Sequence, residues 1–438
     1  MIIILKEVTM LKKVICMLLA VLFFVSCTEK SQQSVVPALQ KSSPVPINPN
    51  YSSEKDKPKI KGTVKRNKSS YFPLNFDEQK AVWVSYIDLQ SMLLGKSGEY
   101  FRKSISEAYA KIKELGCNTV YVHVRSFGDA YYKSELFPWT KGISGEIAAQ
   151  PDFDPLEIMV SEAHGLGLSF HAWINPMRCE TDENMAQMPD KYKIKQWYDD
   201  SEKYAEYLVK SDSDNHYWLN PAIEEVRNLI ADGAGEIVKN YDVDGIHIDD
   251  YFYPTTDPDF DKKIYAQEGG GKDLSQWRKE NVSLMVKGIH DSVKAVNGEV
   301  LFGVSPQGNM ENNYEYMYAD VKQWCGEDGY IDYIVPQIYF GFKNSAKPFE
   351  STAAEWSEAV TCKEVKLIIG LGVYKISQED EFWQDTGIIG RQIEASQKLE
   401  NYGGFALYNY INLFAPDEKV AERTNAELKC IKDIADDN

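Results

Sequence analysis

Residues 241–254 read Tyr-Asp-Val-Asp-Gly-Ile-His-Ile-Asp-Asp-Tyr-Phe-Tyr-Pro and are the most informative part of the chain about its fold. Apolar residues alternate in its first half, which is typical of a buried strand. If the isoleucines of this run face a layer of helices, His247 and Asp249 face the opposite way. A carboxylate, followed at once by Asp250, therefore lies at the carboxyl end of a strand. Taken alone, the Asp-Asp pair is equally compatible with a helix cap or a loop anchor.

Two earlier stretches, residues 118–125 and 168–175, show the same alternation. In both, apolar residues take one face, and a row that includes a histidine takes the other. The chain has six histidines, and three of them occupy such rows. Because helical patterns separate these strands, we expect the rows to line the inside of a barrel near its mouth. The two rows consist of Tyr121, His123, Arg125, His171, Trp173 and Asn175.

Eight strand-like runs follow one another at roughly regular intervals, with helical patterns between most of them. This alternation predicts an α/β fold, a (β/α)8 TIM barrel with long strand-to-helix loops. The predicted strands are Val82–Tyr86, Thr119–Arg125, Leu168–Ile174, Gly245–Asp249, Val300–Ser305, Tyr333–Tyr339, Lys366–Val373 and Gly404–Tyr408.

Composition narrows the class of protein. The chain has 438 residues, 43% of them hydrophobic, which is enough for a large buried core. Its net charge of −18 argues against a nucleic-acid partner. The seven cysteines show no CxxC spacing, so we expect neither a zinc ribbon nor a disulfide framework. We expect no cofactor.

The N-terminus predicts export. Residues 1–27 contain a basic segment, a short apolar segment and a Ser-Cys junction, which together resemble a bacterial lipoprotein signal that ends in a lipidated Cys27. An ordinary signal peptide with an incidental cysteine is the alternative. Residues 28–75 are polar and predict a disordered tether, and 76–438 form the barrel domain. We expect a cell-envelope protein that is lipid-anchored to a bacterial membrane, touches it through the anchor alone and faces the periplasm or the exterior.

The segments after the strands are long and aromatic. Tyr251 and Tyr253 follow the fourth strand, and Gln337 and Tyr339 end the sixth. Aromatic faces stack on sugar rings, and loops on a rigid scaffold carry function. The alternative is that these rings simply hold the loops together.

Six ordered motifs resemble the glycosyl hydrolase-like 10 family: residues 125–139, 171–178, 244–254, 277–282, 302–308 and 331–339. The resemblance covers about residues 78–425. It implies a TIM barrel similar to retaining glycosidases, in which an Asp near the end of the fourth strand is the nucleophile, and Asp249 matches that position. In those relatives a Glu near the fifth strand is usually the acid. This chain has Ser-Pro-Gln-Gly at 305–308 instead, with Glu311 shortly after. Cleavage of peptidoglycan glycan strands is the activity that the resemblance implies.

Glycoside cleavage needs one protonated and one charged carboxyl group. We expect Asp249 to be the charged group, kept ionised by Arg125 and His247. The acid stays open between Asp250, Asp129 and Glu311, and so does the choice between retention and inversion. The residues expected to bind the polysaccharide are Arg125, His171, Trp173, Asn175, His247, Tyr251, Tyr253, Gln337 and Tyr339.

Two other functions remain open from the sequence. A metal-dependent polysaccharide deacetylase or hydrolase would bind Zn²⁺ through His123, His171 and Asp249. A non-catalytic barrel would bind the glycan without cleaving it. We expect no metal, because a fixed cation at Arg125 beside the histidine row would repel one.

Overall fold

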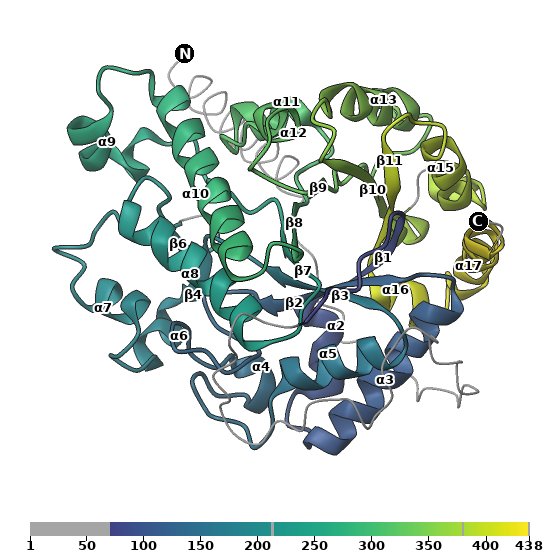
Figure 1. Cartoon of the computed structure of the whole chain (residues 1–438), viewed down its shortest axis with the longest axis horizontal. Coiled ribbons are helices and arrows are strands. Elements are labelled where there is room, and N and C mark those ends of the chain that lie inside the picture. Colours follow the sequence, from purple (N-terminus) through teal and green to yellow (C-terminus); the bar gives the residue numbers. More distant parts are fainter. Residues whose placement is uncertain (1–70, 212–213, 379–380, 437–438) are drawn as a thin grey trace, which may run out of the picture. The chain divides into compact units, whose positions relative to one another are not determined.

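The computed structural model describes residues 71–211, 214–378 and 381–436. Eight parallel strands close into a barrel in the order β1-β11-β10-β9-β8-β7-β3-β2, and helices surround the ring (Figure 1). The predicted (β/α)8 barrel is confirmed, and each predicted strand overlaps an observed one. The strands are β1 (Gln79–Val84), β2 (Thr119–Arg125), β3 (Ser169–Ile174), β7 (Gly245–Ile248), β8 (Leu301–Val304), β9 (Tyr333–Ile334), β10 (Lys366–Gly372) and β11 (Tyr402–Tyr408).

Local sequence sets where several helices begin. Ser85 and Asp88 form a reciprocal capping box at the start of α2, and Asp154 caps α5 just before a proline. The long helices α8 and α10 pack against each other outside the barrel. The helices are α2 (Tyr86–Leu93), α3 (Gly98–Glu114), α4 (Lys141–Ser144), α5 (Pro155–Gly165), α6 (Asp182–Gln187), α7 (Lys193–Asp199), α8 (Glu224–Asn240), α9 (Lys262–Glu268), α10 (Leu274–Val296), α11 (Met310–Glu315), α12 (Val321–Gly326), α13 (Phe349–Ala359), α14 (Glu381–Gln384), α15 (Ile388–Ser396), α16 (Tyr410–Phe414) and α17 (Ala421–Asp436), with 3₁₀ turns η1 (Pro258–Phe260) and η2 (Val373–Ser377).

A second, antiparallel sheet grows from the segment after β3. Its strands are β4 (Arg178–Thr181), β5 (Leu208–Lys210) and β6 (His216–Leu219), in the order β4-β6-β5. This segment was expected to be a long loop, because strands of three or four residues are too short to show an alternating pattern. The sheet matters for the site, since β4 begins at the carboxyl end of the barrel.

The barrel has two apolar regions. One lies between the strands and the surrounding helices. The other fills the barrel itself, and its members come from the inward faces of six strands and the residue after β9. It consists of Ala81, Trp83, Tyr121, Trp173, Tyr333, Val335, Ile368 and Ala406.

Arg125 does not face the barrel interior as alternation predicted. The register between β2 and β3 shifts after His123, so that Arg125 pairs with Ile174, which belongs to the outer core. Its guanidinium lies 4.3 Å from the ring centroid of Phe137. It also fills the space over Gly233 of α8, where an added Cβ would come 2.1 Å from Nη1. The prediction was wrong because a bulge reverses which face a residue occupies.

The folded part starts earlier than predicted. Tyr71 and Leu74, which we had placed in the tether, both donate hydrogen bonds to the buried carboxylate of Asp244, and His164 contacts the same group. The predictions for Cys27 and for residues 1–70 lie outside the described residues. Within the described part, no helix is both long enough and apolar enough to span a bilayer.

Candidate active site

Asp249 follows β7 directly, at the carboxyl end of the barrel, as predicted. The indole Nε1 of Trp173 donates to its Oδ2 at 3.0 Å, and the backbone N–H of Tyr251 donates to Oδ1 at 3.4 Å. Burial, and then the charge of Asp250, raise the pKa of Asp249 to about 7. This direction is opposite to our expectation, since neither Arg125 nor His247 acts as the stabilising cation.

Asp250 follows Asp249 in the chain, and its side chain is held by a residue of the segment after β9. Gln337 Nε2 donates to Asp250 Oδ1 at 3.1 Å and to the carbonyl of Ser305 at the same distance. Burial raises the pKa of Asp250, while hydrogen bonds from the Gln337 and Gln307 side chains oppose that rise. Gln337, predicted to bind substrate, therefore fixes a carboxyl group.

Arg178 is the cation of the site. It begins β4, and its guanidinium lies 4.5 Å from the ring centroid of Phe127 and 4.0 Å from that of Tyr251. Its charge favours the ionised forms of both Asp249 and Asp250 and so lowers their pKa values. In the described part of the chain, it forms no ion pair with a carboxylate. Arg178 lies within the motif at residues 171–178, but we had expected Arg125 to be the cation of the site.

An aromatic wall stands on this side of the carboxyl pair. Tyr251, which is exposed, stacks on Trp218 with 6.0 Å between ring centroids. Phe127 stacks on His216 at 5.2 Å and meets the ring of Tyr86 edge-on. Arg178 lies between the Tyr251–Trp218 pair and the Phe127–His216 pair. The aromatic wall therefore joins the segments after β1, β2 and β7 to the small sheet.

A second aromatic group lies across the barrel, at the ends of β9, β10 and β11. Tyr339 and Tyr408 stack at 5.8 Å, and Tyr374 contacts both rings edge-on. The negative charge of Asp250 contributes to raising the pKa of Tyr339, which places this group close to the carboxyl pair. The two aromatic groups therefore lie on two sides of the carboxyl pair.

The two predicted sugar-binding histidines lie deeper in the barrel. Trp83 Nε1 donates to His247 Nε2 at 3.1 Å, so the proton of this ring is on Nδ1, which contacts Tyr333 Oη at 3.2 Å. The Tyr333 hydroxyl contacts His171 Nδ1 at 2.7 Å, and His171 Nε2 contacts Ser169 Oγ at 3.1 Å. Burial lowers the pKa of both histidines, to about 4 for His171. The prediction was wrong, because alternation gives the face of a residue but not its depth.

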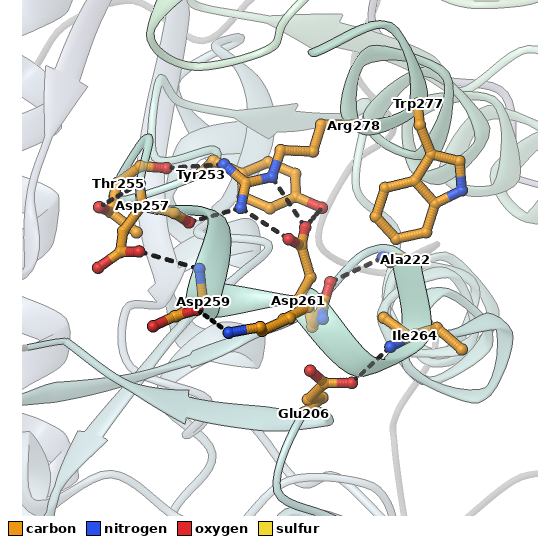
Figure 2. A network of polar contacts seen from close by, with 12 residues as sticks. Glu206, Ala222, Tyr253, Thr255, Asp257, Asp259, Asp261, Ile264, Trp277 and Arg278 are labelled. Carbon is orange, nitrogen blue, oxygen red and sulfur yellow. Dashed lines mark hydrogen bonds and ion pairs between the residues drawn. The ribbon is translucent and has the colours of Figure 1, made fainter. Parts of the chain in front are cut away.

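Tyr253 is also enclosed, in the network that Figure 2 shows. Its hydroxyl donates to Asp261 at 3.0 Å, and Arg278 of α10 binds both oxygens of the same carboxylate, at 2.9 and 2.6 Å. Arg278 also reaches the hydroxyl of Tyr318 and the carbonyl of Asp257. Tyr253 is therefore buried, with its hydroxyl bound to Asp261. The network clamps to α10 the loop that carries the carboxyl pair.

Two other predicted binding residues position neighbours. The side-chain carbonyl of Asn175 accepts from the N–H groups of Met177 and Arg178 at 3.3 and 2.9 Å, and so sets the start of β4. Trp173 is buried, stacks on His123 at 3.8 Å between ring centroids and holds Asp249 by hydrogen bonding.

The remaining predicted acids do not join the pair. Asp129 Oδ1 accepts from the N–H groups of Ser126 and Phe127 at 3.3 and 2.9 Å, as a loop anchor does. Glu311 is exposed on α11 and lines a surface pocket with Tyr314 and Lys322. Asp250 is therefore the candidate acid that the structure places beside Asp249.

The proposed zinc ligands do not converge. His171 is occupied by Tyr333 and Ser169 below the site, while His123 stacks on Trp173. In the ranges that the structure describes, no three His, Cys, Asp or Glu side chains are grouped closely enough to hold a metal ion.

The fold is a (β/α)8 barrel with a carboxyl pair at the end of its fourth strand. Sequence comparison identifies the family to which this barrel belongs. Residues 78–385 match the model of the glycosyl hydrolase-like 10 family, so the chain belongs to that family. It is 33% identical over 348 residues to glycosyl hydrolase YngK of Bacillus subtilis, with 74% of this chain and 66% of YngK covered. It is 31% identical over 317 residues to glycosyl hydrolase DigH of Escherichia coli K12, covering 66% of this chain and 70% of DigH. The chain thus spans just under two thirds of the length of YngK.

Solved structures support the fold. The catalytic domain of β-amylase from Paenibacillus polymyxa aligns with a TM-score of 0.50 at 13% identity, over 82% of this chain and 99% of that one. An α-L-fucosidase from Paenibacillus thiaminolyticus aligns with the same score at 12% identity, over 82% and 49% of the two chains. At these identities the two structures support the fold alone.

Proposed function

We propose that this protein is a glycoside hydrolase and that Asp249 and Asp250 are its reacting carboxyl groups. The observation that carries the proposal is the pair itself: two adjacent carboxyl groups, both with raised pKa values, at the carboxyl end of a barrel strand between two aromatic groups. Glycosidases need carboxyl groups whose protonation states differ at neutral pH.

The surroundings of the two carboxyl groups suggest which one is charged during the reaction. For Asp249, the charge of Arg178 is the largest influence that favours ionisation, and Trp173 Nε1 adds a hydrogen bond. For Asp250, the largest such influence is the neutral amide of Gln337. Burial nevertheless raises the pKa of Asp249 to about 7, so we assign it the charged role on its position at the end of the fourth strand, which matches the nucleophile of the glycosidases that the chain resembles, and we assign the proton-donating role to Asp250. Because like charges disfavour double ionisation, losing the proton from one raises the pKa of the other.

For the substrate, we propose the glycan strands of peptidoglycan. The family match, the names of the relatives as glycosyl hydrolases and the two aromatic groups all support a long saccharide substrate. The N-terminal signal with Cys27 supports a lipid-anchored protein of the bacterial cell envelope, where this polymer lies.

Incubation of residues 71–438 with purified glycans tests the proposal. The panel contains peptidoglycan with stem peptides, peptidoglycan without them, and unrelated polysaccharides, and the readout is new reducing ends and product mass. We expect products from peptidoglycan that disappear in Asp249→Asn and persist in the control Glu311→Gln, an exposed carboxyl change on the same face. Binding without products would support a glycan-binding barrel. Release of acetate, lost with a chelator and restored by Zn²⁺, would support the metal-dependent deacetylase.

A further inference from the structure

Two buried carboxyl groups, those of Asp129 and Glu180, belong to the segments that also carry Phe127 and Arg178 of the aromatic wall. Asp129 lies in the loop after β2, where its Oδ1 accepts from the N–H groups of Ser126 and Phe127. Glu180 lies in β4, and its Oε2 accepts from Asn184 Nδ2 at 2.7 Å. The two residues are 1% and 2% exposed, so both carboxyl groups are shielded from bulk solvent.

One oxygen of each carboxyl group lacks a hydrogen-bond partner among the described residues. Asp129 Oδ2 and Glu180 Oε1 are buried and have no hydrogen-bond donor among the described residues. A buried oxygen without a donor is costly, and two ionised carboxylates near each other in a dry environment repel. One proton held between the two oxygens removes both costs, since it gives each oxygen a partner and cancels one charge.

The segments that carry the two residues are in contact, since a Cβ added to Gly128, next to Asp129, would come 2.9 Å from the Sγ of Cys179, next to Glu180. The electrostatics of the pair agree with this closeness. Burial, and then the charge of Asp129, raise the pKa of Glu180 to about 7. Lys141 of α4 faces the pair at 3.8 Å from Glu180 Oε2 and acts in the opposite sense. Burial raises the pKa values of the Cys179 thiol and the Tyr131 hydroxyl, and the charges of Asp129 and Glu180 act in the same direction, so both groups are neutral. Arg125 opposes that rise at Cys179.

We propose that one proton shared between Asp129 Oδ2 and Glu180 Oε1 latches the loop after β2 onto β4, and that this latch positions Phe127 and Arg178 beside the carboxyl pair of the site. Asp129 holds the backbone N–H of Phe127, and Glu180 is two residues along β4 from Arg178. The ring and the guanidinium that the latch brings together lie 4.5 Å apart. Asp129 and Glu180 are thus positioning residues.

The latch opens as pH rises. Because the folded state raises the pKa of Glu180 above its ordinary 4.5, the folded state binds more protons than the unfolded chain between pH 4.5 and about 7. Stability therefore falls across that window, and above it the pair carries two charges that repel. Glutamine at position 180 has an N–H that imitates the shared proton at every pH.

Thermal unfolding of wild type and Glu180→Gln between pH 5 and 9 tests the latch without any substrate. We expect similar midpoints near pH 5 and a difference in favour of Glu180→Gln that grows up to about pH 8. The difference between two proteins cancels the contribution of other titrating groups. Glu311→Gln, at an exposed carboxyl, should differ from wild type by the same amount at every pH. A Glu180→Gln protein that is equally or less stable than wild type throughout the range would overturn the shared proton.

Hydrogen exchange tests the positioning directly. At pH 8.5 the amides of residues 126–130 should exchange more slowly in Glu180→Gln than in wild type, while at pH 6 the two proteins should agree. Asp129→Asn serves as a second variant: its Oδ1 can still accept from the loop N–H groups, and its Nδ2 supplies a donor in place of the shared proton, so this segment should also exchange more slowly than in wild type at pH 8.5. Equal exchange of the segment in wild type and Glu180→Gln at pH 8.5 would show that the pair does not hold Phe127. Neither measurement depends on the proposed glycosidase activity.

Discussion

Replacing Asp249 by Asn should make the protein more stable at alkaline pH. The side chain is 4% exposed, and its pKa rises from the ordinary 3.8 to about 7. A raised carboxyl pKa means that the folded state binds more protons than the unfolded chain between these two values. Wild-type stability therefore falls as pH rises from about 4 to 7, and the cost is complete above that window.

The size of the effect follows from the same values. Each pKa unit is worth ~1.4 kcal/mol, so ionised Asp249 costs the folded state ~4 kcal/mol above pH 8. Asn carries no charge, and its Oδ1 still accepts from Trp173 Nε1. It gives up the weak contact with the Tyr251 N–H, worth about 1 kcal/mol at most. The net expected gain is ~3 kcal/mol near pH 8.5 and close to zero near pH 4.5.

Urea unfolding at constant ionic strength, repeated between pH 4.5 and 8.5, measures this difference. The slope with urea must stay the same in both proteins, so that the comparison concerns stability alone. A difference that does not change with pH, or an Asn variant that is less stable at pH 8.5, would refute the raised pKa. Confirmation would show that the site holds a carboxylate at the expense of stability, as catalytic sites do.

Three further predictions concern the surroundings of the pair. Arg278→Met should lower the free energy of unfolding by about 3–5 kcal/mol, because Asp261 is then buried without its bidentate partner. Urea unfolding measures this loss, and a loss below about 1 kcal/mol would mean that the Arg278–Asp261 pair does not hold the loop to α10. Arg178→Met should move the acidic limb of the pH–rate profile to higher pH, because it removes the positive charge that favours ionised Asp249. An acidic limb at the same pH in both proteins would mean that Arg178 does not influence the ionisation of Asp249. Tyr251→Ala should impair cleavage of long saccharides more than short ones, because its exposed ring is available to stack on a sugar. The dependence of kcat/KM on chain length measures this, and equal losses would mean that the ring only supports its loop.

Much of the fold could be predicted because its signals are local. Buried parallel strands read as alternating or continuous apolar runs, and the position of Asp249 followed directly from one of them. Arg125 shows the limit of that reasoning, since a one-residue bulge turns its side chain toward α8 and nothing in the local pattern marks the bulge. The small sheet of β4, β5 and β6 was missed for a similar reason: its strands are too short for a pattern to appear.

The candidate site was predicted in part. Asp249 and Asp250 lie together, and Tyr251 and Tyr339 belong to the two aromatic groups. Depth could not be inferred, because the same inward face includes both the layer at the mouth and the enclosed layer of His171.

Other roles depend on contacts between distant segments. Tyr253 follows the strand as closely as Tyr251 does, yet Asp261 and Arg278 enclose it. The positions of Arg178 and Glu180 could not be predicted, because both residues lie in β4 of the small sheet that the sequence pattern did not reveal. The motif at 171–178 contained Arg178, so motif membership was the one signal that could have identified it.

The measurement that tests the central claim most directly is kcat/KM of the wild type and Asp249→Asn on peptidoglycan glycan strands, at the pH optimum and with folding verified by unfolding midpoint. The account predicts a loss of ~10³-fold or more, because the variant lacks the charge that the site supplies to the transition state. Asp250→Asn, measured alongside, should also lose most of its activity. An Asp249→Asn enzyme that cleaves the glycan at close to the wild-type rate would contradict the account.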